Sequence, residues 1–315
     1  MTYGSKGSSW TAKDLASYAS TTGATAARSA SAKAVYEASK LHDDLDPRKM
    51  KGPRESLASV NSPFPTSVVF GLDVTGSMNH VLKELAANGL PELMEGLFDL
   101  KTISDPQVML AAYGDMKCGD DSPAQFGQFE INKLALDVIK KIHFEGGGGS
   151  NDSESTSAIW AFAHHMTRCA SFEETPKRKG FIFTFGNDGL DQLRDEDMLY
   201  LTGNPQIKAI TTEELYNRVS ENWFVFHIHL EDDKHFYSSS VVETYRKVMG
   251  QNLLICKDIK TLTKLIVSTI DVVQGNSVKA AASRWNGESS IAVISALSNY
   301  SVAAQSGAGT GVVAL

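Results

Sequence analysis

Short apolar runs alternate with longer amphipathic segments through the middle of the chain. Residues 67–72 (SVVFGL), 180–185 (GFIFTF) and 223–230 (WFVFHIHL) are mostly apolar, which is typical of strands buried on both faces of a sheet. Residues 81–100 instead place leucines at helical spacing. The alternation of the two patterns favours parallel strands joined by helices.

This pattern extends over residues 66–270, which we predict to form one domain. The expected strands are residues 67–72, 108–113, 180–185, 223–230 and 252–256, and the expected helices are 81–100, 131–142, 157–169, 213–221, 241–248 and 259–270. Their order predicts an α/β fold with a doubly wound, mostly parallel, Rossmann-like sheet and helices on both faces.

The two flanks differ from this domain in composition. Residues 1–65 are rich in Ala, Ser and Thr, with few large apolar side chains, and predict a weakly packing N-terminal arm. Residues 271–315 carry little charge and are rich in Ala, Ser and Gly. We expect a C-terminal tail that docks on a partner or remains mobile.

The charge balance and the cysteine spacing of the chain argue against some classes of protein. The chain has 30 Lys+Arg against 37 Asp+Glu, and the excess acid lies within residues 66–270. This balance argues against a nucleic-acid binder but not against a site for metal cations.

Without a long apolar segment or secretory pattern we expect a cytoplasmic protein with no membrane contact. Cys118, Cys169 and Cys256 form no C-x-x-C pair, so we expect free thiols.

Oxygen-bearing side chains follow the first predicted strand. Asp73, Thr75 and Ser77 form a D-x-T-x-S pattern, in which Gly76 permits a tight turn. The alternation places three oxygen donors on one side of a short loop. Hard divalent cations prefer such oxygen ligands, and neutral hydroxyls leave the ion electrophilic.

Two further loops belong to the same edge of the predicted sheet, because ligands of open α/β sheets bind at the carboxyl ends of strands. Residues 146–156 (GGGGSNDSEST) precede a predicted helix, and residues 186–189 (GNDG) follow a strand. Taken alone, Asp73 fits a helix N-terminal acid and the glycine run fits a flexible loop. The run lacks the G-K-[ST] of a phosphate-binding loop. Together, the three loops favour a metal site.

These motifs resemble those of the von Willebrand factor A (VWA) family. The chain is similar to its bacterial and phage-type intracellular members, which carry a metal-ion-dependent adhesion site (MIDAS). The resemblance covers about residues 54–270. The shared segments are LDVTGSM (residues 72–78), YGD (113–115), QFE (128–130), EGGGG (145–149) followed by Glu154-Ser155, and the strand at 179–186.

The resemblance implies a VWA fold and a ligand set for a divalent cation. Asp73, Thr75 and Ser77 match the family's D-x-[ST]-x-S element. The implied ion is Mg²⁺, with Mn²⁺ or Ca²⁺ as alternatives.

The other two loops leave the ligand assignment open. The family usually has Thr after two glycines in the second loop, whereas this chain has Ser150, Asn151 and Asp152 there. We favour Asp152 and keep Glu154 as a second candidate. The third-loop acid maps to Asp188, with a register open by one residue.

The resemblance implies a binding protein, not an enzyme. A partner protein would present a carboxylate to the ion within a larger assembly, and family members often work beside AAA+ ATPases. A scaffold subunit with a degenerate metal site is an alternative. A metal-dependent hydrolase is another, although spare carboxylates such as Asp115 are the only clear candidates for its general base. His227 and His229 share one strand face, for which a structural role is the favoured interpretation.

Overall fold

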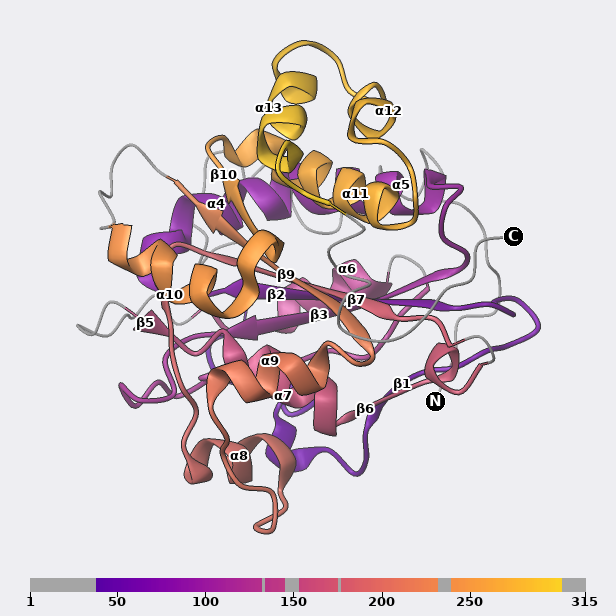
Figure 1. Cartoon of the computed structure of the whole chain (residues 1–315). Coiled ribbons are helices and arrows are strands. Elements are labelled where there is room, and N and C mark those ends of the chain that lie inside the picture. Colours follow the sequence, from indigo (N-terminus) through magenta and orange to yellow (C-terminus); the bar gives the residue numbers. More distant parts are fainter. Residues whose placement is uncertain (1–37, 132–133, 145–152, 175–176, 232–238, 302–315) are drawn as a thin grey trace.

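A mostly parallel sheet forms the centre of the molecule (Figure 1). The computed structural model describes residues 38–131, 134–144, 153–174, 177–231 and 239–301. Within these residues the main sheet has six strands in the order β10-β9-β7-β2-β3-β4. Adjacent strands pair in parallel except for β4, which is antiparallel to β3 at one edge. The strands are β2 (Thr66–Asp73), β3 (Pro106–Tyr113), β4 (Ala124–Phe126), β7 (Gly180–Gly186), β9 (Trp223–Leu230) and β10 (Leu253–Cys256).

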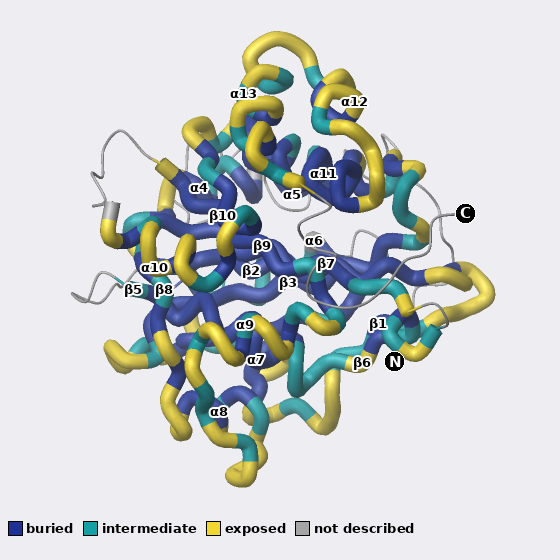
Figure 2. Tube along the Cα trace, in the orientation of Figure 1, coloured by how far each residue is buried: buried dark blue, intermediate teal, exposed yellow. Residues whose placement is uncertain are grey.

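Helices cover both faces of this sheet, and the buried residues lie between the layers (Figure 2). One face carries α4 (Asn79–Glu84), α5 (Leu90–Asp99), α6 (Leu134–Asp137), α11 (Leu262–Val273), α12 (Val278–Ala282) and α13 (Gly287–Leu297). The other face carries α7 (Ser157–His165), α8 (Asp195–Thr202), α9 (Thr212–Val219) and α10 (Ser239–Met249). The prediction of an α/β fold with a central, mostly parallel sheet is confirmed.

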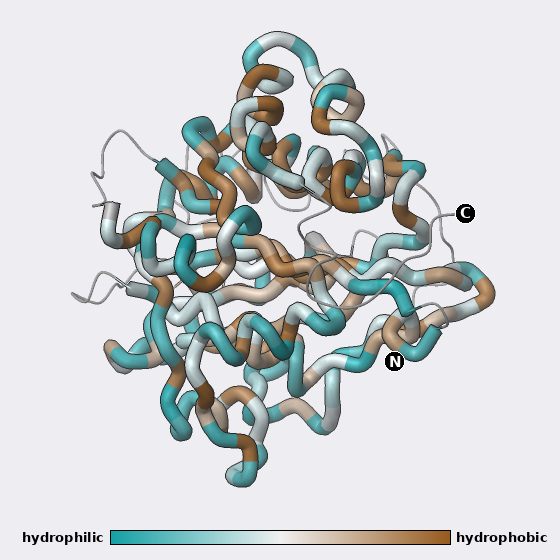
Figure 3. The backbone as a smooth tube through the Cα atoms, viewed as in Figure 1, coloured by the Kyte–Doolittle hydropathy of each residue, from teal (hydrophilic) through white to brown (hydrophobic). Residues whose placement is uncertain are grey.

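The apolar strand sequences follow from this sandwich. Every residue of β2, β3 and β7 is buried, because each strand has helices above and below it. Figure 3 shows apolar segments in the central strands and in parts of the helices around them. Close packing extends to the helices, since a Cβ on Gly96 of α5 would lie 2.7 Å from the Val267 side chain of α11.

The strand order defines where the sheet opens toward a ligand. After β2 the chain passes to β3 on one side, and it later returns to β7 on the other side of β2. Such a reversal of direction creates a crevice at the carboxyl ends of the strands. Asp73 ends β2 at this crevice and is paired in register with Tyr113, the last residue of β3.

Three predicted helices differ from the structure. In the described part of the helix expected over 131–142, α6 ends at Asp137 and a 3₁₀ helix (η4, Val138–Lys141) follows it. The helix expected over 81–100 contains a π-helical turn (η3, Leu85–Gly89) just before Pro91, which has no N–H to continue regular bonding. The helix expected over 157–169 ends at His165, and Thr167–Cys169 forms β6 instead. That strand pairs with β1 (Arg54–Ser56), whose Arg54 N–H donates to the Met166 carbonyl at 2.8 Å.

The described parts of both flanks pack onto the central domain. Before residue 66, Leu45 is buried in the core and its carbonyl accepts a hydrogen bond from Phe126 N–H. After residue 270, α12 and α13 pack on α11 and bury Val293 and Leu297. The rest of the predicted arm (1–37) and tail (302–315) lies outside the described residues. No helix in the described ranges is both long and apolar enough to cross a bilayer.

Candidate functional site

Asp73 is fully buried at the end of β2 and organises the loop that follows it. Its Oδ1 accepts hydrogen bonds from the Thr75 N–H at 3.0 Å and the Thr75 hydroxyl at 2.6 Å. The Thr75 and Ser77 hydroxyl oxygens are 3.3 Å apart. A 3₁₀ turn (η2, Gly76–Met78) then leads into α4. The three predicted donors of the first loop therefore lie together.

The loop after β7 joins this group through Asn187. Ser77 Oγ donates a hydrogen bond to Asn187 Oδ1 at 3.0 Å, and the Asn187 side chain is buried. The neighbouring Asp188 is half-buried, and its charge acts on both Asp73 and Glu154. The structure thus places Asn187 against the first loop and Asp188 beside it.

The segment before α7 completes the cluster. Asp152, the favoured second-loop candidate, lies outside the described residues. Glu154 is buried in the short strand β5 (Ser153–Glu154), which pairs in parallel with β8 (Gly189–Leu190) after the third loop. Ser155 N–H donates to the Gly114 carbonyl at 3.0 Å, next to the end of β3. Segments from four places in the sequence therefore meet at one edge of the sheet, near the β5 label in Figure 1.

Burial and mutual repulsion perturb the carboxyl groups of this cluster. Burial, with the charges of Asp188 and Asp120, raises the pKa of Asp73 to about 7, although hydrogen bonds from Thr75 oppose the shift. Burial and the negative charges of Asp73 and Asp188 raise the pKa of Glu154 above that of Asp73, to about 10. Within the described part of the chain, Asp73 Oδ2 and Glu154 Oε2 are buried without a hydrogen-bond partner. Buried carboxylate oxygens in this state favour a proton or a cation.

Gly186 allows the β7 backbone to approach Asp73. A Cβ at this position would lie 2.7 Å from Asp73 Oδ2 and 2.8 Å from the Tyr113 hydroxyl oxygen. The Tyr113 hydroxyl in turn donates to the Phe185 carbonyl at 3.1 Å. Any side chain at position 186 would therefore displace the carboxylate or the phenol.

The donor set fits a small, hard cation. Octahedral Mg²⁺ with bonds of about 2.1 Å requires neighbouring ligand oxygens about 3 Å apart. The oxygens of Asp73, Thr75, Ser77 and Asn187 follow one another at 2.6, 3.3 and 3.0 Å. Across the described ranges, no three His, Cys, Asp or Glu side chains gather as a metal site. A cation here would depend on hydroxyl and amide oxygens as well as carboxylates.

Asp115 lies in the neighbouring β3–β4 loop, where its carboxylate accepts hydrogen bonds from backbone N–H groups of the same loop. Its Oδ1 accepts from the Lys117 N–H at 2.7 Å and the Cys118 N–H at 3.2 Å. The Lys117 ammonium forms an ion pair with Asp191 of the loop after β8. This ion pair connects the β3–β4 loop to the segment after β8.

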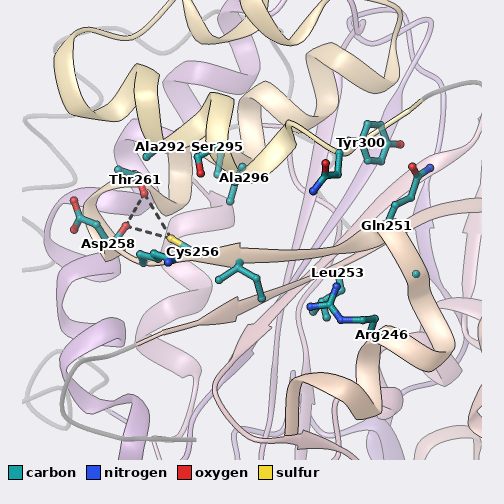
Figure 4. Close-up of a pocket in the computed structure, with 15 residues that line it drawn as sticks. Arg246, Gln251, Leu253, Cys256, Asp258, Thr261, Ala292, Ser295, Ala296 and Tyr300 are labelled. Atoms are coloured by element: carbon teal, nitrogen blue, oxygen red, sulfur yellow. Dashed lines mark hydrogen bonds between the residues drawn. The ribbon is translucent and has the colours of Figure 1, made fainter. Parts of the chain in front are cut away.

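A separate cavity of about 350 Å³ lies between β10, α10 and α13 (Figure 4). None of the described candidate ligands lines it. The Cys256 thiol on its wall is 3.2 Å from the Asp258 carbonyl oxygen. Burial raises the pKa of this thiol to about 11, so it stays protonated at neutral pH.

Two contacts at the site could not be predicted from the sequence. Asn187 belongs to the predicted GNDG loop, whose ligand register was open by one residue, and its contact with Ser77 depends on β2 and β7 being neighbours. Tyr245 of α10 reaches Thr156 at the start of α7, with 2.7 Å between the hydroxyl oxygens. The sequence around Tyr245 predicts only an amphipathic helix, so it does not indicate a contact with Thr156.

Comparisons with known proteins give distant structural neighbours. No protein-family model and no curated protein sequence matches the chain. The pilus adhesin SpaC of Lactobacillus rhamnosus GG, in its open conformation, is similar over 70% of this chain with 10% identity and a TM-score of 0.40. Proximal thread matrix protein 1 from the mussel byssus is similar over 67%, with 10% identity and a TM-score of 0.43. The match spans 31% and 48% of those chains, and at this distance neither assigns a function.

Proposed function

We propose that this chain is a VWA-type binding protein that holds a divalent cation of the Mg²⁺ class at a MIDAS-like site and recognises a carboxylate of a partner protein. The observation that carries the proposal is the group of oxygens from Asp73, Thr75 and Ser77, in which successive oxygens lie 2.6 and 3.3 Å apart and Ser77 is hydrogen-bonded to Asn187. Octahedral Mg²⁺ needs neighbouring ligand oxygens at about this separation. The crevice at the reversal of strand order supports the same position.

Each side chain has a distinct part in this proposal. Asp73 and Glu154 would supply the negative charge, and because a ligating carboxylate must be deprotonated, cation binding there would be coupled to loss of their protons. Thr75 and Ser77 supply neutral hydroxyls, and Asn187 holds the Ser77 hydroxyl in place. The bound ion would supply an open coordination position for an anionic oxygen of the partner.

Calorimetric titration tests the cation site. Mg²⁺ and Mn²⁺ are titrated into metal-stripped wild type, Asp73→Asn and the control Asp99→Asn, which changes an exposed acid at the end of α5. We expect binding by wild type and Asp99→Asn and its loss in Asp73→Asn. Equal binding by all three proteins would remove the assigned site.

Chelation tests the recognition step. A partner protein that co-purifies with the wild type should dissociate in EDTA, return with Mg²⁺, and fail to bind Asp73→Asn. If the partner stayed bound to the wild type in EDTA and also bound Asp73→Asn, a metal-bridged contact would be excluded. A scaffold role would then replace the proposal.

A further inference from the structure

Two neighbouring residues of α10 contact different segments of the candidate metal site. Thr244 Oγ1 accepts a hydrogen bond from the Leu190 N–H at 3.0 Å, in the strand β8 that follows the third loop. The Tyr245 hydroxyl shares a 2.7 Å hydrogen bond with the Thr156 hydroxyl, two residues after Glu154. A single turn of α10 therefore contacts both strands of the β5–β8 pair or their immediate continuation.

The Tyr245 side chain packs against residues of the central sheet. Its buried ring stacks on the His227 ring of β9, with centroids 3.8 Å apart and planes 4° apart. His227 Nδ1 lies 3.0 Å from the Thr184 hydroxyl on β7. Burial raises the pKa of Tyr245 and lowers that of His227, so both groups stay neutral near pH 7. Four side chains thus connect the central strands with the start of α7.

The contact at Thr156 bears on the position of Glu154. Thr156 N–H donates to the Glu154 carbonyl at 2.8 Å, while the intervening Ser155 N–H donates to Gly114 at 3.0 Å. Thr156 is fully buried and precedes the first residue of α7. Ligand groups need positions fixed to about 0.5 Å for tight binding, and their supporting contacts commonly set metal affinity.

We propose that Tyr245 is a positioning residue, which holds Thr156 and thereby Glu154 in the geometry that sets the affinity of the site for its cation. This inference rests on the proposed metal site. Coupling of binding free energies is reciprocal, so the cation must in turn stabilise α10.

The matched pair Tyr245→Phe and Tyr216→Phe tests the role of the hydroxyl. Tyr245→Phe keeps the ring on His227 and removes only the contact with Thr156. Tyr216→Phe removes a different hydroxyl, which bonds Asn252 at 2.8 Å and contacts no site segment in the described structure. Calorimetry should show Mn²⁺ affinity reduced about 10- to 100-fold in Tyr245→Phe and unchanged in Tyr216→Phe.

Thr156 variants give an independent test. Thr156→Ser keeps the hydroxyl and should bind Mn²⁺ as wild type. Thr156→Val should lose at least as much affinity as Tyr245→Phe, because the Thr156 hydroxyl also interacts with Tyr113. The double variant Tyr245→Phe/Thr156→Val should lose no more than Thr156→Val alone, because both changes remove the same hydrogen bond between Tyr245 and Thr156. Additive losses would contradict the assignment to this pair.

Hydrogen exchange separates a positioning role from a merely structural one. Mn²⁺ should slow exchange of the α10 amides in wild type and in Tyr216→Phe, but not in Tyr245→Phe. Wild type that binds no Mn²⁺ would overturn the proposed function itself. Wild type and Tyr245→Phe that bind Mn²⁺ equally would overturn only this inference.

Discussion

Ser77, in the loop after β2, donates a hydrogen bond to Asn187, in the loop after β7, at 3.0 Å. The two residues are 110 positions apart in the sequence. They meet because β2 and β7 are parallel neighbours, whose carboxyl ends lie at one edge of the sheet. This contact determines which residue of the third loop faces the first.

Replacing Asn187 tests this register. Asn187→Ala should weaken Mg²⁺ binding about 10- to 100-fold, because the Ser77 hydroxyl loses the oxygen that orients it. Calorimetry measures the effect, with Asn204→Ala, in the exposed turn after α8, as the control. If Asp188→Asn abolished binding while Asn187→Ala left it intact, Asp188 would be the third-loop ligand.

The raised pKa of Asp73 predicts an unusual dependence of stability on pH. The neutral carboxyl favours the fold, so its contribution is complete below about pH 4 and is lost as pH rises through about 7. In EDTA, wild type should lose thermal stability relative to Asp73→Asn as the pH is raised over this window. Melting curves between pH 4.5 and 8 measure the difference. A difference independent of pH would show that Asp73 is ionised throughout.

Gly186→Ala should damage both the fold and the cation site. The added Cβ meets Asp73 Oδ2 and the Tyr113 hydroxyl at less than 3 Å, and overpacking of this kind costs about 1–3 kcal/mol. Denaturant unfolding gives the stability, and Mg²⁺ titration gives the binding. The control Gly52→Ala, where no atom lies within 4 Å of the added Cβ, should be nearly neutral. Unchanged metal binding in a folded Gly186→Ala protein would contradict the close approach.

Leu297→Ala tests whether the segment after residue 270 stabilises the domain. Leu297 of α13 is fully buried in the core cluster that includes α11, so its truncation should cost about 2–5 kcal/mol of unfolding free energy. Ile291→Ala on the exposed side of the same helix should cost much less. Equal, small effects of both changes would indicate that α13 unfolds independently of the sheet.

Much of the fold could be predicted because buried strands and helix faces require apolar residues at regular positions in the sequence. Strands covered on both faces, such as β7 and β9, are mostly apolar, so their positions could be predicted from the sequence. The edge strand β4 and the short strands β1, β5, β6 and β8 were not predicted. Strands of two or three residues form by pairing with distant segments and need no pattern of their own.

The first-loop donors could be predicted for a similar reason. Asp73, Thr75 and Ser77 lie within five residues, so the loop itself brings their oxygens together. Thr156, which precedes α7, and Tyr245, in α10, are in contrast 89 residues apart. Their contact depends on how α7 and α10 pack against the same face of the sheet.

Local sequence patterns specify the alternation of strands and helices, the buried central strands and the cluster of oxygen donors after β2. These features depend on neighbours along the chain, whose spacing is fixed by covalent geometry. The contact of Asn187 with Ser77, the burial of Glu154 near Asp73 and the hydrogen bond between Tyr245 and Thr156 are instead set by the tertiary fold. Those relations arise from strand order and helix packing, which bring together residues that no local pattern connects.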